Sequence, residues 1–156
     1  MAGVWNYRLS LGFDLFQVQS VSMHPALHEG DLVVVRLNKA NSHHSFNKGD
    51  IIVFNDPNVK KMKLIKRIAY VPGESVTYSK LITVMDDKTH RPVAYREQQT
   101  LEHINGYFVL GDNPKHSTDS RNFGPIDPSQ IVGKVFFTIP KENLGWLYSM
   151  AAWLKN

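Results

Sequence analysis

The chain has 156 residues, of which 42% are hydrophobic and 21% charged, so it fits one globular domain with a sizeable buried core rather than a disordered chain. Its 18 Lys and Arg outnumber its 14 Asp and Glu, and the formal net charge of +4 would suit an anionic membrane surface or a nucleic acid without requiring either. The absence of cysteine excludes disulfides, thiol nucleophiles and cysteine-bound metals, and it leaves the cellular compartment open.

The N-terminal segment, residues 1–17, is too polar for a membrane span. Large apolar side chains recur in it, but Arg8 and Asp14 interrupt them, whereas a spanning helix needs roughly 20 mostly apolar residues. A secretory signal peptide with its small-residue cleavage site is not visible either. We therefore expect residues 1–17 to be a lead-in to a single domain that occupies residues 1–156.

Short apolar runs rich in β-branched residues and bounded by turn residues predict a mainly β fold, in the manner of a barrel or sandwich of short strands. The predicted strands cover residues 32–35, 51–54, 64–71, 76–84, 107–110 and 132–139. Two polar stretches, 38–48 and 86–102, are expected to be connections. The second lies between strands, so it is interpreted as a small excursion from the main sheet.

The C-terminal segment, residues 141–156, is predicted to be a short apolar helix. Leu144, Leu147, Ala151 and Leu154 recur in it at helical spacing. The segment is too short to span a bilayer, so two readings stay open. It is either a packed terminal helix or an interfacial helix whose neighbouring tryptophans lie among lipid headgroups.

Two hydroxyls precede a proline in the stretch Ser-Val-Ser-Met-His-Pro, at residues 20–25. In a locally extended backbone, Ser20 and Ser22 point to the same side. One hydroxyl could then attack a carbonyl while the other stabilises the resulting oxyanion. Such a pattern is more often a turn or a helix cap, so it does not predict catalysis by itself.

Two adjacent basic residues, Lys66 and Arg67, lie within an apolar predicted strand. Alternation places them on opposite faces, each between apolar neighbours. Removing a lysine from water lowers its pKa, so that its neutral amine can accept a proton, whereas arginine stays protonated. Only Lys66 can therefore be a general base, although both side chains could instead extend to water from a strand edge.

A long polar loop, residues 111–125, follows the predicted strand at 107–110. Glycines and prolines punctuate it, and its hydroxyls, acids and arginine could satisfy one another, for example through an ion pair between Asp119 and Arg121. Loops of this kind more often hold a site in place than perform chemistry.

Taken in order, these segments resemble the signal peptidase I family of Ser/Lys endopeptidases. The resemblance rests on four boxes and covers about residues 16 to 139. They are a Ser-Met-x-Pro box at 22–25, a Gly-Asp box with an apolar strand at 30–35, a Lys-Arg to Pro-Gly-acid box at 66–74, and a Gly-Asp-Asn to Asp-Ser-Arg box at 111–121.

The resemblance implies a role for each matching residue. Ser22 would be the nucleophile and Lys66 the base, with Ser20 and the Ser22 backbone N–H stabilising the oxyanion. Ser117 would orient the Lys66 ammonium. The residues expected to support the site are Met23, Pro25, Asp112, Asn113, Asp119 and Arg121. No metal and no cofactor are expected.

The resemblance also implies a fold and a function. We expect a signal-peptidase-like or LexA-like β-barrel that cleaves leader peptides from exported preproteins after small residues and binds the preprotein in an extended conformation. It would be membrane-associated, with its catalytic domain on the outer (periplasmic or intermembrane-space) face. Family members usually carry a membrane span just upstream of the serine. Contact with the membrane is therefore expected from an anchor outside this chain, or from Phe13, Leu15, Phe16 and the C-terminus.

One departure from the family pattern bears on the substrate. Pro114, Lys115 and His116 stand where Arg-Asp-Asn is more usual, which points to the smaller family members of conjugation systems or the mitochondrial inner membrane. A dedicated pilin maturation peptidase is therefore an alternative to a general signal peptidase. The sequence leaves the oligomeric state open.

Other classes of protein fit less well. A self-cleaving repressor of the LexA kind would need a helix-turn-helix upstream of the serine, for which residues 1–19 are too few. A non-enzymatic basic β-barrel that binds nucleic acid would show aromatics interleaved with Lys and Arg on exposed strands, which this chain lacks. The seven histidines include His24 and His28 and the pair His43 and His44, but they lack helical context and a clear carboxylate ligand, so surface positions are expected.

Overall fold

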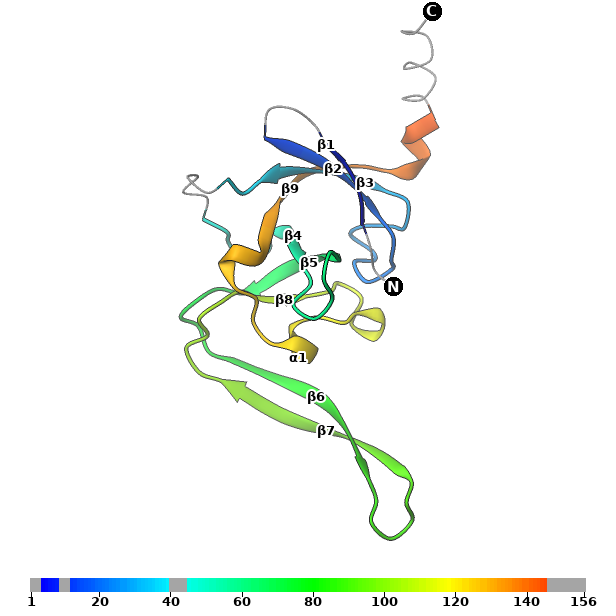
Figure 1. Cartoon of the computed structure of the whole chain (residues 1–156), viewed down its shortest axis with the longest axis vertical. Coiled ribbons are helices and arrows are strands. Elements are labelled where there is room, and N and C mark those ends of the chain that lie inside the picture. The colour runs from blue at the N-terminus through cyan, green and yellow to red at the C-terminus, as the bar shows by residue number, and fades with distance from the viewer. Residues whose placement is uncertain (1–3, 9–11, 40–44, 146–156) are drawn as a thin grey trace, which may run out of the picture.

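The protein folds as one curled antiparallel sheet from which a long hairpin extends (Figure 1). The computed structural model describes residues 4–8, 12–39 and 45–145. The sheet has seven strands in the order β1-β2-β3-β9-β4-β5-β8. These strands are β1 (Val4–Arg8), β2 (Phe13–Val18), β3 (Leu32–Leu37), β4 (Ile51–Asn55), β5 (Lys63–Tyr70), β8 (Phe108–Leu110) and β9 (Ile131–Ile139). The prediction of a mainly β fold is confirmed.

The sheet curls around a cluster of buried apolar side chains, which we call the first core cluster. Strands β2 and β5 are separated by three others in the sheet, yet Phe16 of β2 and Ile65 of β5 pack in the same cluster. Bulges in the pairing of β3 with β9, of β4 with β9 and of β5 with β8 bend the strands. At the β3–β9 contact, a Cβ atom on Gly133 would lie 2.3 Å from the Arg36 carbonyl oxygen, so the close approach requires glycine.

Strands β4 and β5 are apolar on both faces, and each face contributes to a different core cluster. The first cluster comprises Phe16, Val18, Met23, Leu27, Val33, Val35, Val53 and Ile65. The second comprises Phe46, Ile52, Phe54, Leu64, Ile68, Val109, Ile126 and Ile131. Burial on both faces explains why β4 is a continuous apolar run and why Lys66 and Arg67 of β5 both have apolar neighbours.

Residues 1–17, expected as a lead-in, contain the two strands β1 and β2 of the main sheet. The side chain of Phe16, expected to contact a membrane, is fully buried in the core. Phe13 and Leu15 are only half-buried. The expectation failed for Phe16 because β2 faces the core with every second residue, and the interruption by Asp14 hides this alternation in the sequence.

Residues 86–102, expected as a polar connection, contain strand β7 (Pro92–Leu101). It pairs over its whole length with β6 (Val76–Met85) to form the separate hairpin of Figure 1. Nearly all residues of β7 are exposed, including the large apolar Val93 and Tyr95. A buried apolar face, the usual cause of regular alternation in a strand, is therefore missing.

The helical segments are short: η1 (Pro114–His116), α1 (Ser120–Phe123), η2 (Pro128–Gln130) and η3 (Lys141–Asn143). Of the helix predicted over residues 141–156, the part at 146–156 lies outside the described residues, so it stays a prediction. Within the part of the chain that the structure describes, no helix has the length and apolarity to cross a bilayer.

Replacing Phe54, which has no exposed surface in the second cluster, tests the core assignment. Phe54→Ala should lower the free energy of unfolding by about 3–5 kcal/mol, because it removes buried surface and leaves a cavity. Phe136→Ala, at a phenylalanine that is 65% exposed, is the matched control and should cost less than about 1 kcal/mol. Urea unfolding measures both, and equal losses would contradict the assignment.

Candidate active site

Ser22 lies in a turn that is anchored in the first core cluster. The segment follows β2, and the backbone N–H of His24 donates to the Val21 carbonyl at 3.1 Å. The side chains of Met23 and Leu27 are buried in the cluster, and Ser22 itself is only 2% exposed. Pro25, by contrast, is exposed and follows a cis peptide bond. The core therefore fixes the backbone that follows Ser22.

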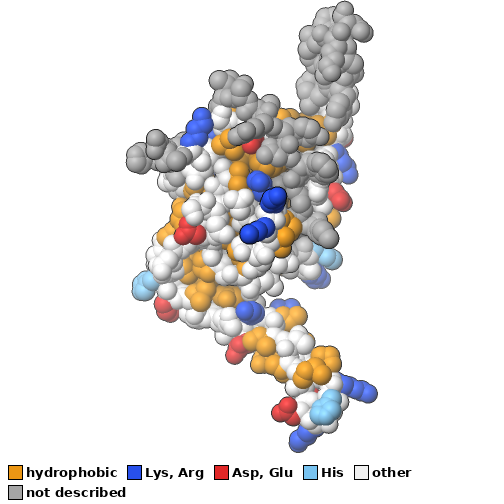
Figure 2. Space-filling view, viewed as in Figure 1, with side chains coloured by type: hydrophobic (Ala, Val, Ile, Leu, Met, Phe, Trp, Pro, Cys, Tyr) orange, Lys and Arg blue, Asp and Glu red, His pale blue; other side chains and the backbone are white. Residues whose placement is uncertain are grey.

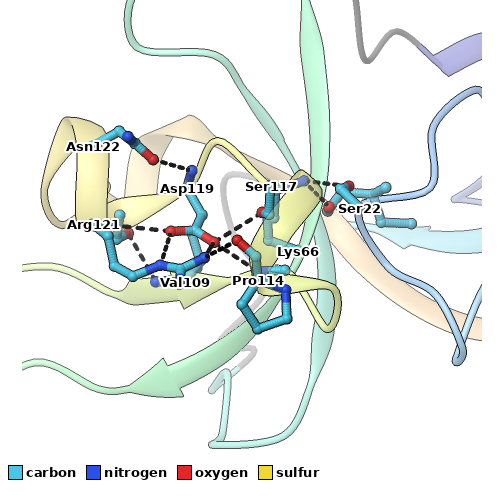
Figure 3. A network of polar contacts seen from close by, with 11 residues as sticks. Ser22, Lys66, Val109, Pro114, Ser117, Asp119, Arg121 and Asn122 are labelled. Carbon is cyan, nitrogen blue, oxygen red and sulfur yellow. Dashed lines mark hydrogen bonds and ion pairs between the residues drawn. The ribbon is translucent and has the colours of Figure 1, made fainter. Parts of the chain in front are cut away.

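Lys66 extends from β5 toward this turn. Its Nζ atom donates to the Ser22 hydroxyl oxygen at 2.7 Å and to the Ile65 carbonyl at 3.0 Å (Figure 3). The alternation predicted for the strand holds, since Lys66 lies between Leu64 and Ile68 of the second cluster and is 1% exposed. The structure thus brings together two residues that are 44 positions apart.

The Ser20 hydroxyl lies beside that of Ser22. Their Oγ atoms are 3.1 Å apart, and either one could be the donor. The two hydroxyls therefore lie together, although residues 20–22 form a bend and a turn and not the extended backbone on which the expectation rested. Ser20 is in position to donate a hydrogen bond beside the Ser22 hydroxyl.

Burial controls the protonation of Lys66. Removal from water lowers the pKa of Lys66 from 10.5 to about 8, although the negative charges of Asp119 and Asp112 oppose this fall. A substantial fraction of the side chain is therefore a neutral amine at mildly alkaline pH. Arg67, on the other face of β5, has a raised pKa because it hydrogen-bonds Asp112, so it cannot serve as the base.

Asp119 is the centre of the loop network in Figure 3 and has no exposed surface. Its carboxylate accepts from the Gly111 N–H at 3.0 Å, from the Ser117 hydroxyl at 2.8 Å and from the Arg121 guanidinium at 2.7 and 2.9 Å. The predicted ion pair between Asp119 and Arg121 is thereby confirmed. Burial alone would raise the pKa of Asp119, but the hydrogen bonds from Arg121, Gly111 and Ser117 outweigh it and hold that pKa below its usual value.

Asp119 also begins α1. Its side chain accepts from the Arg121 N–H, while the Asn122 side chain accepts from the N–H of Asp119, which is a capping box. The next residue, Ser120, is fully buried and accepts from the N–H of Val109 in β8. The loop is therefore attached to the sheet immediately beside the site.

Ser117 lies against the site, but its hydroxyl donates to Asp119 and not to Lys66. Among the described residues, the hydrogen-bond acceptors of Lys66 are Ser22 and Ile65. A Cβ atom on Gly111 would come within 2.2 Å of the Ser117 Oγ and 2.7 Å of the Ser22 carbonyl oxygen. Gly111 thus lets the loop approach both serines, a role that the sequence did not reveal.

Asp112 and Asn113 attach the loop to the strand and to the turn. The N–H of Asn113 donates to the Ser22 carbonyl at 2.9 Å, and its side chain donates to the Val21 carbonyl at 3.1 Å. Asp112 accepts two hydrogen bonds from Arg67, at 2.7 and 2.9 Å. Both residues were expected to support the site, and these contacts show how they can hold the Ser22 backbone against β5.

A groove of about 590 Å³ opens over Ser22 and Lys66. Its apolar lining includes Val59 and Met62 from the loop between β4 and β5, and Phe123 from α1. His116 and Thr118 line it from the polar loop at residues 111–125. The contribution of the β4–β5 loop could not be predicted from the sequence, because its apolar residues are scattered among turn residues.

Histidines do not assemble a metal centre in the described part of the chain. His24 and His28 lie edge to face, with ring centroids 4.9 Å apart, and both are exposed. No group of three or more His, Cys, Asp or Glu side chains among the described residues could hold a metal ion.

Comparison with known proteins identifies the class of enzyme that this fold and site belong to, which is a peptidase. The family model described as "Signal peptidase, peptidase S26" matches residues 6–140. The match covers most of the chain, and we conclude that the chain belongs to this signal peptidase family.

Individual relatives agree with the family match. The chain is 35% identical over 150 residues to signal peptidase I of Bacillus caldolyticus, covering 80% of this chain and 78% of that protein. It is 30% identical over 141 residues to signal peptidase I V of Bacillus subtilis, covering 77% and 82%. It is also 28% identical over 127 residues to the mouse mitochondrial inner membrane protease subunit 1, covering 81% and 69%.

The burial of Lys66 predicts a pH-dependent stability. Between pH 8 and 10.5 the unfolded chain holds the Lys66 proton and the folded chain does not, so the wild type becomes more stable as the pH rises through this window. Below about pH 8 both states hold the proton, and the folded protein carries the full cost of the buried charge. A pKa fall from 10.5 to about 8 corresponds to about 3 kcal/mol.

Lys66→Met removes this dependence. Relative to wild type, its free energy of unfolding should therefore fall by up to about 3 kcal/mol between pH 8 and 10.5. Urea unfolding at a series of pH values measures the difference. Lys88→Met, at an exposed lysine, is the control and should show a constant difference. A constant difference for Lys66→Met as well would show that Lys66 keeps its ordinary pKa.

Proposed function

We propose that this peptidase is a serine endopeptidase that uses Ser22 and Lys66 as a dyad to remove N-terminal signal peptides from exported preproteins after small residues. The observation that carries the proposal is the 2.7 Å contact between Lys66 Nζ and the Ser22 hydroxyl, both closed to water. A lysine with a pKa near 8 in contact with a serine is suited to activate it as a nucleophile.

The geometry supports the following sequence of steps. The neutral Lys66 amine accepts the Ser22 proton as the hydroxyl oxygen attacks the scissile carbonyl. The Ser20 hydroxyl and the Ser22 N–H stabilise the oxyanion. The Lys66 ammonium then gives its proton to the leaving amine, and the acyl-enzyme forms. Finally, Lys66 activates a water molecule that hydrolyses the acyl-enzyme and regenerates Ser22.

The groove supports binding of an extended substrate. It runs past Ser22 between the turn at residues 20–22, the β4–β5 loop and α1, and its walls include Val59, Met62 and Phe123. An extended peptide presents alternate side chains to the same wall. Small residues one and three positions before the scissile bond would therefore enter the groove together, while larger ones would be held away from Ser22.

We further propose that the protein works at a membrane, with its catalytic domain on the outer face. One relative is named as a mitochondrial inner membrane protease subunit. On this chain, Phe136 and Phe137 of β9 are 65% and 49% exposed, and Phe136 packs against Phe13 with ring centroids 5.7 Å apart. Exposed aromatic clusters of this kind favour a membrane interface.

A dedicated maturation peptidase for a single partner, such as a pilin, is the second candidate. The supporting observation is His116, one of the residues that departs from the family pattern, because it lines the groove over Ser22 and Lys66. Such an enzyme would cleave its own partner and fail on a generic preprotein with the same cleavage site.

Substitution of the dyad tests the proposed function on a preprotein with an Ala-x-Ala cleavage site. Ser22→Ala and Lys66→Met should each lower kcat/KM by at least about 10³-fold. Lys66→Arg should fail as well, because it keeps the charge but cannot release a proton near neutral pH. Ser129→Ala, at an exposed serine of η2, should keep wild-type activity. Turnover by folded Ser22→Ala would refute the dyad.

The pH dependence of cleavage tests the role of Lys66 separately. Because the neutral amine is the active form, kcat/KM should rise with pH and level off above an apparent pKa near 8. Asp112→Asn should move this rise in kcat/KM to lower pH, since it removes a negative charge that raises the pKa of Lys66. Glu74→Gln, which breaks the surface pair with Lys48, should leave it in place. An apparent pKa near 10.5 for the rise in wild-type kcat/KM would contradict a desolvated base.

A further inference from the structure

A second cleft lies between the hairpin and the loop that carries Asp119. Its volume is about 340 Å³, and β6, β7 and residues 114–122 form its walls. The polar and charged side chains that matter here are Ser79, Lys80, Arg96, Lys115, Ser117 and Asn122. In Figure 2, Lys or Arg side chains, and an acidic one close by, are visible where the hairpin leaves the body of the protein.

The cleft has an excess of positive charge. Lys80, Arg96 and Lys115 form no ion pair within 4 Å among the described residues, and no acid lines the cleft. Glu97 lies opposite Lys80 in the β6–β7 register, but the two side chains do not pair. With hydroxyl and amide donors beside these cations, the cleft is suited to an anionic ligand.

The loop forms a thin wall between this cleft and the groove over the dyad. Its side chains alternate, because Lys115 and Ser117 line the cleft whereas His116 and Thr118 line the groove. The two spaces are therefore only one backbone thickness apart. At about 3.3 Å per residue, a peptide that leaves the groove needs only a few residues to reach the cleft.

From this arrangement we infer that the cleft binds an acidic segment of the preprotein just after the scissile bond. The inference rests on the proposed function and extends it to a substrate class. The leader itself is excluded as the occupant, since signal peptides combine a positively charged start with an apolar centre. An anionic lipid is the alternative occupant, because the hairpin also exposes Leu81, Met85 and Tyr95, and it is one of the outcomes of the test.

Two matched preproteins test the inference. They share an Ala-x-Ala leader and differ only at residues 3–8 after the cleavage site, which are Asp and Glu in one and Asn and Gln in the other. The wild type should cleave the acidic substrate with a kcat/KM about five-fold higher at low salt, and about 0.5 M NaCl should remove most of this preference. Lys80→Glu and Lys115→Glu should each bring the ratio to one or below. Lys88→Glu, the same charge change at the hairpin turn outside the cleft, should keep the wild-type ratio.

The outcomes separate this inference from the proposed function. In one outcome, the wild type cleaves both substrates with equal kcat/KM, while Ser22→Ala cleaves neither. That result would overturn the inference that the cleft binds an acidic segment and would leave the peptidase assignment intact. Cleavage of neither substrate, or cleavage that Ser22→Ala retains, would overturn both. Vesicles with anionic lipid form a third arm. If they accelerate both substrates equally and Lys80→Glu removes the acceleration, the cleft binds lipid headgroups and the inference is wrong.

Discussion

Lys66 holds its Nζ atom 2.7 Å from the Ser22 hydroxyl in a region closed to water, although burying an ammonium group opposes folding. The surrounding structure makes this contact possible. Leu64 and Ile68 place Lys66 on one face of β5 within an apolar cluster, while Met23 and Leu27 anchor the turn that carries Ser22. Two core clusters therefore meet at one hydrogen bond, and the site depends on the packing of both.

The loop from 111 to 123 provides the second layer of support, and Asp119 is its centre. A buried carboxylate is tolerated there because backbone, hydroxyl and guanidinium donors all point at it. The same negative charge acts on Lys66 across the site and limits the fall of its pKa. Asp119 thus contributes to local structure and to the electrostatics of the proposed base, which explains why the loop carries so many polar groups for its length.

Much of this arrangement could be predicted from the sequence. Runs of β-branched residues between turns identified most strands, and the chemistry of the two adjacent basic residues singled out Lys66 over Arg67 as the candidate base. The predictions that failed concern features that depend on tertiary structure. β7 has no buried face because it belongs to an exposed two-stranded ribbon, and Phe16 is buried on the same face of β2 as the charged Asp14. The close approach at Gly111, and Asp119 as the partner of Ser117, depend on how the loop returns to the sheet.

Side chains at residues 115–118 alternate between the groove and the second cleft, and this alternation affects which sequence changes the loop can accept. Because neighbouring side chains face different spaces, a single nucleotide change can alter one surface and leave the other untouched. The linings of the two spaces can then change separately at Lys115, His116 and Thr118, whereas Ser117 is tied to the site by its hydrogen bond to Asp119. A one-residue insertion would do the opposite, since it would displace both sets of side chains from the short helix η1 (Pro114–His116) onward. Lineages of such a loop should therefore change by substitution and conserve their length.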